Sequence, residues 1–148
     1  MTNAYKYSII YFLAFSLLLM ISGVLLFEYK IGFSVEQISS YYLGDEDKFM
    51  NPQTSSGILK IITPHIFAFG LFIMVLLHFL IFTKKRSSKT LIAVIYLTFL
   101  SAILELLSPF GIINSIEFFA YVKLLSFIIF ELLVLFSSWL LFRSIVYE

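Results

Sequence analysis

Five titratable side chains lie inside long apolar stretches of this sequence: His65, His78, Glu105, Lys123 and Glu131. Such groups are expensive inside a membrane, and they usually face the interior of a helical bundle or a water-filled cavity. Depending on how they are grouped, they could hold a metal, a haem, the head group of a quinone or a proton. These five residues are therefore the candidates for a functional site.

Three of the candidates are expected at similar depth, in the outer third of the membrane. Counting about 1.5 Å per residue along each predicted helix puts His65, Glu105 and Lys123 within a few turns of one surface. An ion pair between Glu105 and Lys123 beside His65 would form a polar pocket, able to hold a metal on His65, a quinone head group or a haem propionate. The alternative is structural: Lys123 reaches toward the head groups, and Glu105 pairs with it.

Glu131 is expected near the middle of the membrane, where a carboxylate cannot easily reach water. Burial favours the neutral acid, which can donate a hydrogen bond. The functional hypothesis is a proton-relay carboxyl or a ligand contact, as in a proton-coupled transporter of small molecules. The alternative is hydrogen bonding between helices to Ser16 and Ser101, which should lie at similar depth.

The two histidines are thirteen residues apart on one predicted helix, so about 20 Å separates them along its axis and they cannot bind the same ion or haem. The arrangement resembles that in respiratory b-type cytochromes, where one helix offers a histidine to each of two stacked haems. The resemblance implies a b-type haem and electron transfer at His65 or His78. The sequence departs from that pattern in two ways: the two side chains point about 140° apart, and no second helix carries a histidine. A haem on His65 would therefore need a second axial ligand of another type, and Met20 of the first span could face His65. Each histidine could instead face the bundle as a hydrogen-bonded polar residue.

The elements that position these residues are four predicted membrane spans, at about 7–27, 58–82, 90–107 and 116–142. The chain is 61% hydrophobic and 13% charged, whereas a soluble domain is about half apolar and about a quarter charged. Each segment is close to the roughly 20 apolar residues that cross a bilayer. The sequence predicts a single all-α membrane domain, an antiparallel four-helix transmembrane bundle.

The orientation is predicted from the basic sequence KKRSSK at residues 84–89, between the second and third spans. Lysine and arginine are concentrated in short cytoplasmic loops. This turn and both termini are therefore predicted to lie in the cytoplasm, and the protein is predicted to reside in a bacterial inner membrane. Because the turn is so short, the second and third spans should be antiparallel neighbours.

The outer loop between the first two spans is predicted to carry a short amphipathic helix, Val35–Leu43. Ser34 and Gln37 have the spacing of a capping box, and Gly44 is a typical C-terminal stop. This helix could lie at the membrane interface or over the mouth of the bundle.

Two prolines fall within the spans. Pro64 is expected either to kink the second span or to lie in its first turn, with Thr63 as the N-cap. Pro109 and Gly111 are expected to end the third span, and Asn114 is expected to cap the fourth.

Several functional classes lack support in the sequence. The absence of cysteine excludes disulfides, thiolate metal sites and iron–sulfur clusters. A net charge of +1 gives no indication of nucleic-acid binding. No histidine is matched in depth with a serine and an acid, and no Gly-rich phosphate loop occurs, so no enzyme signature is found.

The leading hypothesis is a small integral-membrane binding or accessory subunit with a polar pocket toward the outer face. It would work in the lipid bilayer as part of a larger membrane complex or a homo-oligomer. The alternatives are an electron-transfer module that binds a b-haem or a quinone at His65, a proton-coupled transporter that uses Glu131, and an assembly factor without a ligand.

Overall fold

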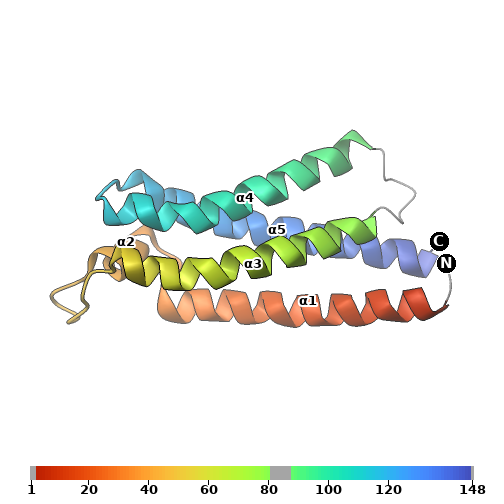
Figure 1. Cartoon of the computed structure of the whole chain (residues 1–148), viewed down its shortest axis with the longest axis horizontal. Coiled ribbons are helices and arrows are strands. Elements are labelled where there is room, and N and C mark those ends of the chain that lie inside the picture. Colours follow the sequence, from red (N-terminus) through yellow and green to blue (C-terminus); the bar gives the residue numbers. More distant parts are fainter. Residues whose placement is uncertain (1–2, 81–87, 148) are drawn as a thin grey trace.

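The computed structural model of the chain describes residues 3–80 and 88–147. Over these residues the chain forms five helices: α1 (Asn3–Lys30), α2 (Val35–Leu43), α3 (Ser55–Phe79), α4 (Lys89–Ile113) and α5 (Phe118–Tyr147). The four long helices are apolar and long enough to cross a membrane. They lie lengthwise beside one another in alternating directions, with both termini at the same end (Figure 1). The predicted all-α bundle of four candidate spans plus a short helix is confirmed.

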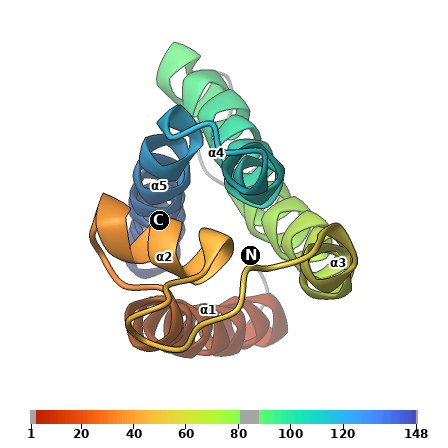
Figure 2. The ribbon, with the colours of Figure 1, turned by 90° about the vertical axis from the view of Figure 1, so that its left-hand side faces the viewer.

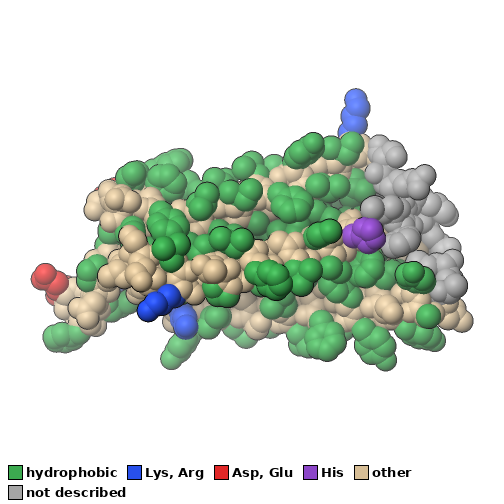
Figure 3. All heavy atoms as spheres, in the orientation of Figure 1, with side chains coloured by type: hydrophobic (Ala, Val, Ile, Leu, Met, Phe, Trp, Pro, Cys, Tyr) green, Lys and Arg blue, Asp and Glu red, His purple; other side chains and the backbone are tan. Residues whose placement is uncertain are grey.

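Apolar side chains cover the outside of the bundle as well as its core. Figure 3 shows them along the whole length of one face, whereas the charged side chains visible there lie near the two ends. Exposed large side chains on the long helices include Phe15, Phe67 and Leu132. A surface of this kind is stable against lipid and not against water, as the composition indicated.

Two apolar clusters fill the interior. The first joins the four long helices toward the termini and includes the fully buried Ile73, Leu76 and Val134. The second lies at the other end of the bundle and includes Ile38 from α2. Figure 2 views the molecule from that end and shows α2 lying across it.

The pair α4 and α5 forms the most extensive contact between helices. On α4, buried residues recur at alternating intervals of three and four: Leu91, Val94, Thr98, Ser101, Glu105, Ser108 and Ile112. On α5 the same alternation gives Ala120, Lys123, Phe127, Phe130, Val134, Ser137 and Leu141. This is the seam of a coiled coil, and its serine and alanine residues allow the two backbones to approach closely.

The short helix α2 begins and ends where the sequence predicts. The Gln37 amide donates to the Ser34 hydroxyl (3.1 Å), and the Ser34 amide donates to the Gln37 side chain (3.1 Å), which completes the capping box. Gly44 ends the helix with a φ of 87°, in the left-handed region that glycine adopts easily. Ile38 and Tyr42 are buried against the bundle, so α2 covers the end of the bundle.

Of the two alternatives for Pro64, the one with Thr63 as the N-cap of the second span is wrong. Helix α3 begins at Ser55, where the Thr54 side chain accepts a hydrogen bond from the Gly57 amide (3.1 Å). Pro64 therefore lies in the helix interior, and the Thr63 hydroxyl donates to a carbonyl of its own helix. The apolar pattern is continuous through the proline, and this continuity outweighs one lost hydrogen bond.

The predicted end of the third span is also wrong. Helix α4 continues through Pro109 and Gly111 to Ile113. Asn114 is its C-cap rather than the N-cap of the next helix, and the side-chain amide of Asn114 donates to the Phe110 carbonyl (2.7 Å). The physical reason lies at the polar site described below, where another helix replaces the hydrogen bond that the proline removes.

The turn between α3 and α4 is only partly described. Most of the basic cluster, residues 84–87, and the predicted end of the second span at residue 82 lie outside the described residues. The Ser88 hydroxyl caps α4 by accepting from the Leu91 amide (3.1 Å).

Candidate functional site

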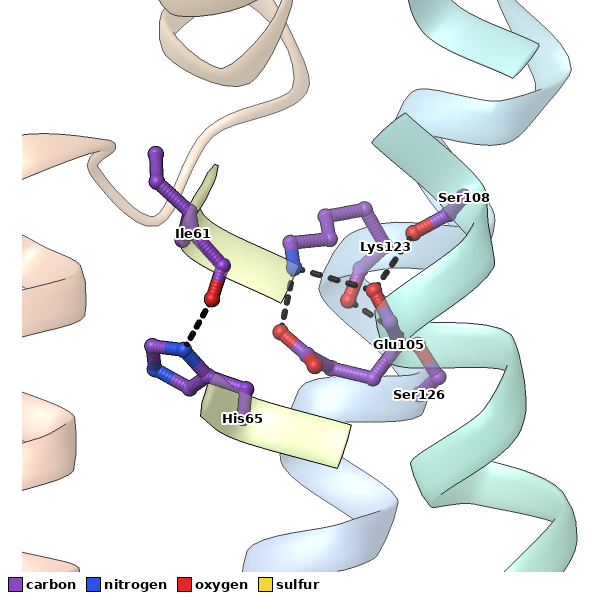
Figure 4. Close-up of polar contacts among 6 residues, drawn as sticks. All are labelled: Ile61, His65, Glu105, Ser108, Lys123 and Ser126. Carbon is purple, nitrogen blue, oxygen red and sulfur yellow. Dashed lines mark hydrogen bonds and ion pairs between the residues drawn. The ribbon is translucent and has the colours of Figure 1, made fainter. Parts of the chain in front are cut away.

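Two of the candidate residues form a buried ion pair between neighbouring helices. Glu105 lies on α4 and Lys123 on α5, and their side chains are 11% and 6% exposed. The Lys123 ammonium donates to the Glu105 carboxylate and also to the Glu105 main-chain carbonyl, at 3.0 Å (Figure 4). The depth arithmetic that suggested this pairing is confirmed.

Pro109 explains why a main-chain carbonyl accepts from a side chain inside a helix. A helical carbonyl normally accepts from the amide four residues later, and for Glu105 that residue is Pro109, which has no N–H. Lys123 and the Ser108 hydroxyl, at 3.1 Å, donate to this carbonyl instead. The proline therefore does not break α4, and it supplies an extra acceptor for the buried ammonium.

Tyr42 of α2 is buried at the same end of the bundle and is a residue that the sequence analysis did not place at the site. Burial raises the pKa of the Tyr42 hydroxyl, and the negative charge of Glu105 and the neighbouring Tyr41 raise it further. The phenol therefore stays protonated and able to donate a hydrogen bond. The signal that could have found it was its position on the apolar face of the predicted short helix.

His65 does not take part in the ion pair. Its ring is exposed, and its Nδ1 lies 2.6 Å from the Ile61 carbonyl of the same helix (Figure 4). Its ring also makes an edge contact with Phe69, with 5.8 Å between the ring centroids. Met20 is buried in the apolar cluster near the termini. Of the predicted outer cluster, the structure brings Glu105 and Lys123 together and leaves His65 apart. In the described parts of the chain, no group of three or more His, Asp or Glu side chains could hold a metal.

His78 lies in the last turn of α3, so both histidines belong to one continuous helix, as expected. Because a helix rises about 1.5 Å per residue, one metal or haem iron cannot be shared between them.

Glu131 lies on α5 and faces α1. A methyl group built on Gly23 of α1 would lie 3.4 Å from the Glu131 Oε1 atom. The Oε2 atom is buried and has no hydrogen-bond partner in the described chain. The predicted hydrogen bonds from Ser16 and Ser101 are not formed, because both hydroxyls donate to carbonyls of their own helices, at 2.7 and 3.0 Å. A serine within a helix can always reach such a carbonyl, and this local bond competes with one between helices.

The four apolar spans and the polar groups enclosed between them define an integral-membrane helical protein. Residues 32–148 match the family described as Aq_1264_TM, a transmembrane helical domain. The match covers α2 to α5 and well over half of the chain, so the protein belongs to this family. Neither a curated protein nor a solved structure matches the chain.

Proposed function

We propose that this protein is a small integral-membrane binding or accessory subunit whose ligand site is the Glu105–Lys123 pair beneath α2. The observation that carries the proposal is an ammonium group held inside an apolar bundle and covered by a helix that contributes Tyr42. An ammonium has three hydrogens, and the contacts described above use two of them. The third can donate to an oxygen atom of a ligand.

Energetics favour a ligand-binding role over a purely structural one. A buried ion pair is a poor source of stability, because the cost of removing two charges from water can exceed their attraction. Apolar side chains of similar volume at the two positions would hold α4 and α5 together at least as well. A charged pair at this position is therefore best explained by a ligand that needs it. The ligand chemistry that fits is an apolar molecule with a carbonyl or carboxylate oxygen, such as a quinone head group.

The test uses a double variant that removes both charges and keeps both volumes, Glu105→Gln with Lys123→Met. Wild-type protein purified from membranes is expected to release a carbonyl- or carboxylate-bearing molecule on organic extraction, detected by mass spectrometry. A short-chain ubiquinone, added as a probe, is expected to raise the unfolding temperature of the wild type only. Identical extracts and identical responses to the probe in the two proteins would refute the proposal. Lys60→Met, which removes an exposed lysine of α3, is the matched control.

The orientation is part of the same proposal: both termini in the cytoplasm of a bacterial cell, and α2 on the outer side of the inner membrane. The basic residues 84–89 support it, because in the sequence they separate the second and third spans, whereas the acidic residues 45–47 separate the first and second. A single cysteine at Phe49, which is 95% exposed, should react with a membrane-impermeant maleimide in spheroplasts. If the cysteine reacted only after lysis, the protein would have the opposite orientation. Assembly into a larger complex or a homo-oligomer is expected to appear as a mass above that of one chain in native mass spectrometry.

A second candidate function, electron transfer through a haem on His65, is supported by one observation. With Nδ1–H donated to the Ile61 carbonyl, the lone pair of the histidine lies on Nε2, the arrangement common in metal-bound histidines. The candidate predicts a Soret absorption band in protein purified with added haem. His65→Ala should abolish the band, and His78→Ala should retain it. A wild-type protein that takes up no haem would rule this candidate out.

A further inference from the structure

A second polar site lies between α1 and α5, whereas the Glu105–Lys123 contact lies between α4 and α5. Two contacts define how these antiparallel helices align. Phe27 stacks on Phe127 with 4.0 Å between the ring centroids. Four residues earlier on α1 and four residues later on α5, Gly23 faces Glu131. The Glu131 carboxyl therefore points at the one position on this part of α1 that has no side chain.

The same alignment, counted seven residues further along each antiparallel helix, puts Ser16 of α1 and Ser138 of α5 at the same level of the bundle. The Ser138 hydroxyl is buried without a hydrogen-bond partner in the described chain, as is the Glu131 Oε2 atom. Ser16 is buried too, and its hydroxyl donates to a carbonyl of α1, which leaves its oxygen able to accept. The contact surface between α1 and α5 thus holds buried polar groups about 10 Å apart along the bundle.

Unsatisfied polar groups of this kind need an explanation. A buried donor or acceptor without a partner destabilises the fold, and proteins usually satisfy such groups with internal water. An apolar residue at position 131 would avoid the cost. A methyl group at Gly23 would fit in ordinary van der Waals contact with the carboxyl, so the glycine leaves a space of about that size beside it. These features fit a carboxyl with room for a water molecule between two helices.

Carboxyl side chains enclosed within membrane-spanning bundles often belong to proton relays, because a carboxyl group can take up and release a proton.

We propose that Glu131 is a proton-binding site and that the protein passes protons through the contact between α1 and α5. In one half of the cycle a hydronium ion gives its proton to the Glu131 carboxylate, leaving water and the neutral acid. In the other half the acid gives this proton to a water molecule on the Ser138 side, which restores the carboxylate. No oxidant or reductant is needed. The proposal is independent of the ligand site at Lys123, because it uses other residues, at the contact of α5 with α1 rather than with α4.

The test measures proton entry into proteoliposomes. A potassium gradient with valinomycin sets the driving potential, and pyranine trapped inside reports acidification. Wild-type protein is expected to acidify the interior faster than protein-free liposomes do. Glu131→Gln should reduce the rate to the protein-free level, and Ser138→Ala should slow it severalfold. A wild-type rate equal to that of protein-free liposomes, or an unchanged rate in Glu131→Gln, would overturn the proposal. A transport rate that depends on the sodium gradient rather than on the proton gradient would overturn the proposal as well.

Matched controls separate this role from an effect on folding. Glu117→Gln and Ser22→Ala replace exposed residues of the same types and should leave the rate unchanged. A second measurement needs no variant at position 131. Dicyclohexylcarbodiimide reacts with protonated carboxyls in apolar surroundings, so wild-type protein treated at neutral pH should carry the adduct on Glu131 and not on Glu117. An unmodified Glu131 would contradict the proposal even if Glu131→Gln failed to fold.

Discussion

Replacing Lys123 by methionine provides the sharpest test of how the buried pair contributes to the bundle. Methionine keeps most of the apolar stem of lysine and removes the ammonium group. The Glu105 carboxylate, with its side chain 11% exposed, then has no opposite charge beside it. The Glu105 main-chain carbonyl keeps only the hydrogen bond from Ser108 (3.1 Å).

The expected loss follows from what remains buried. Removing one partner of a buried ion pair costs about 3–5 kcal/mol, because the other charge is left uncompensated. The lower end of the range, about 3 kcal/mol, is expected here, because hydrogen bonds inside membranes contribute less than their burial suggests. The double variant Glu105→Gln with Lys123→Met carries no buried charge and should lie within about 1 kcal/mol of the wild type. The coupling between the two positions is then about 2 kcal/mol or more.

The assay is reversible unfolding of the detergent-solubilised protein by sodium dodecyl sulfate, followed by circular dichroism. The wild type, both single variants and the double variant form a complete thermodynamic cycle. Lys60→Met, on the exposed face of α3, should stay within about 0.5 kcal/mol of the wild type. A loss below about 1 kcal/mol for Lys123→Met would be the behaviour of a solvent-exposed pair and would refute the reasoning. A double variant no more stable than the single variant would also refute it.

Four smaller predictions concern local structure. Ser34→Ala removes the hydroxyl that caps α2 and should cost about 1 kcal/mol, seen as faster amide exchange in that helix. Gly111→Ala would place a methyl carbon 2.2 Å from an aromatic ring of α5 and should cost about 1–3 kcal/mol. Gly70→Ala meets nothing within 4 Å and should stabilise α3 by up to about 1 kcal/mol, so equal thermal midpoints for the two glycine variants would contradict this packing. A hydrogen bond from Lys48 lowers the pKa of Asp45, so their contact should persist at neutral pH and be lost as the pH falls through that lowered pKa, as followed by NMR titration of the Asp45 carboxyl.

The features that could be predicted from the sequence are those set by neighbouring residues along the chain. Hydropathy over about 20 residues is a local property, and it locates the four long helices. The bounds of α2 were also predictable, because Ser34, Gln37 and Gly44 act on the backbone within a few residues of themselves. Counting depth along two helices made a pairing of Glu105 with Lys123 possible, since a helix has a constant rise, but the same count also grouped His65 with them, which the structure leaves apart.

The same local rules failed at Pro109. From the sequence alone a proline removes a hydrogen bond and should end a helix, yet α4 continues to Ile113. The replacement donor is Lys123, which comes from a different helix and approaches the Glu105 carbonyl only after α4 and α5 have packed. A rule that considers only neighbouring residues in the sequence cannot predict this donor.

The chain's own order of residues thus determined a membrane-spanning helical bundle, its short capping helix and the small set of polar side chains that must be enclosed within it. Tertiary packing decided which of those side chains meet. Tyr42 came to lie near enough to feel the charge of Glu105 because α2 packs on the end of the bundle, and Gly23 faces Glu131 in the same alignment of α1 on α5 that stacks Phe27 on Phe127. Rotation and sliding of one apolar helix against another change hydropathy very little, so only the fit of side chains between helices selects one arrangement.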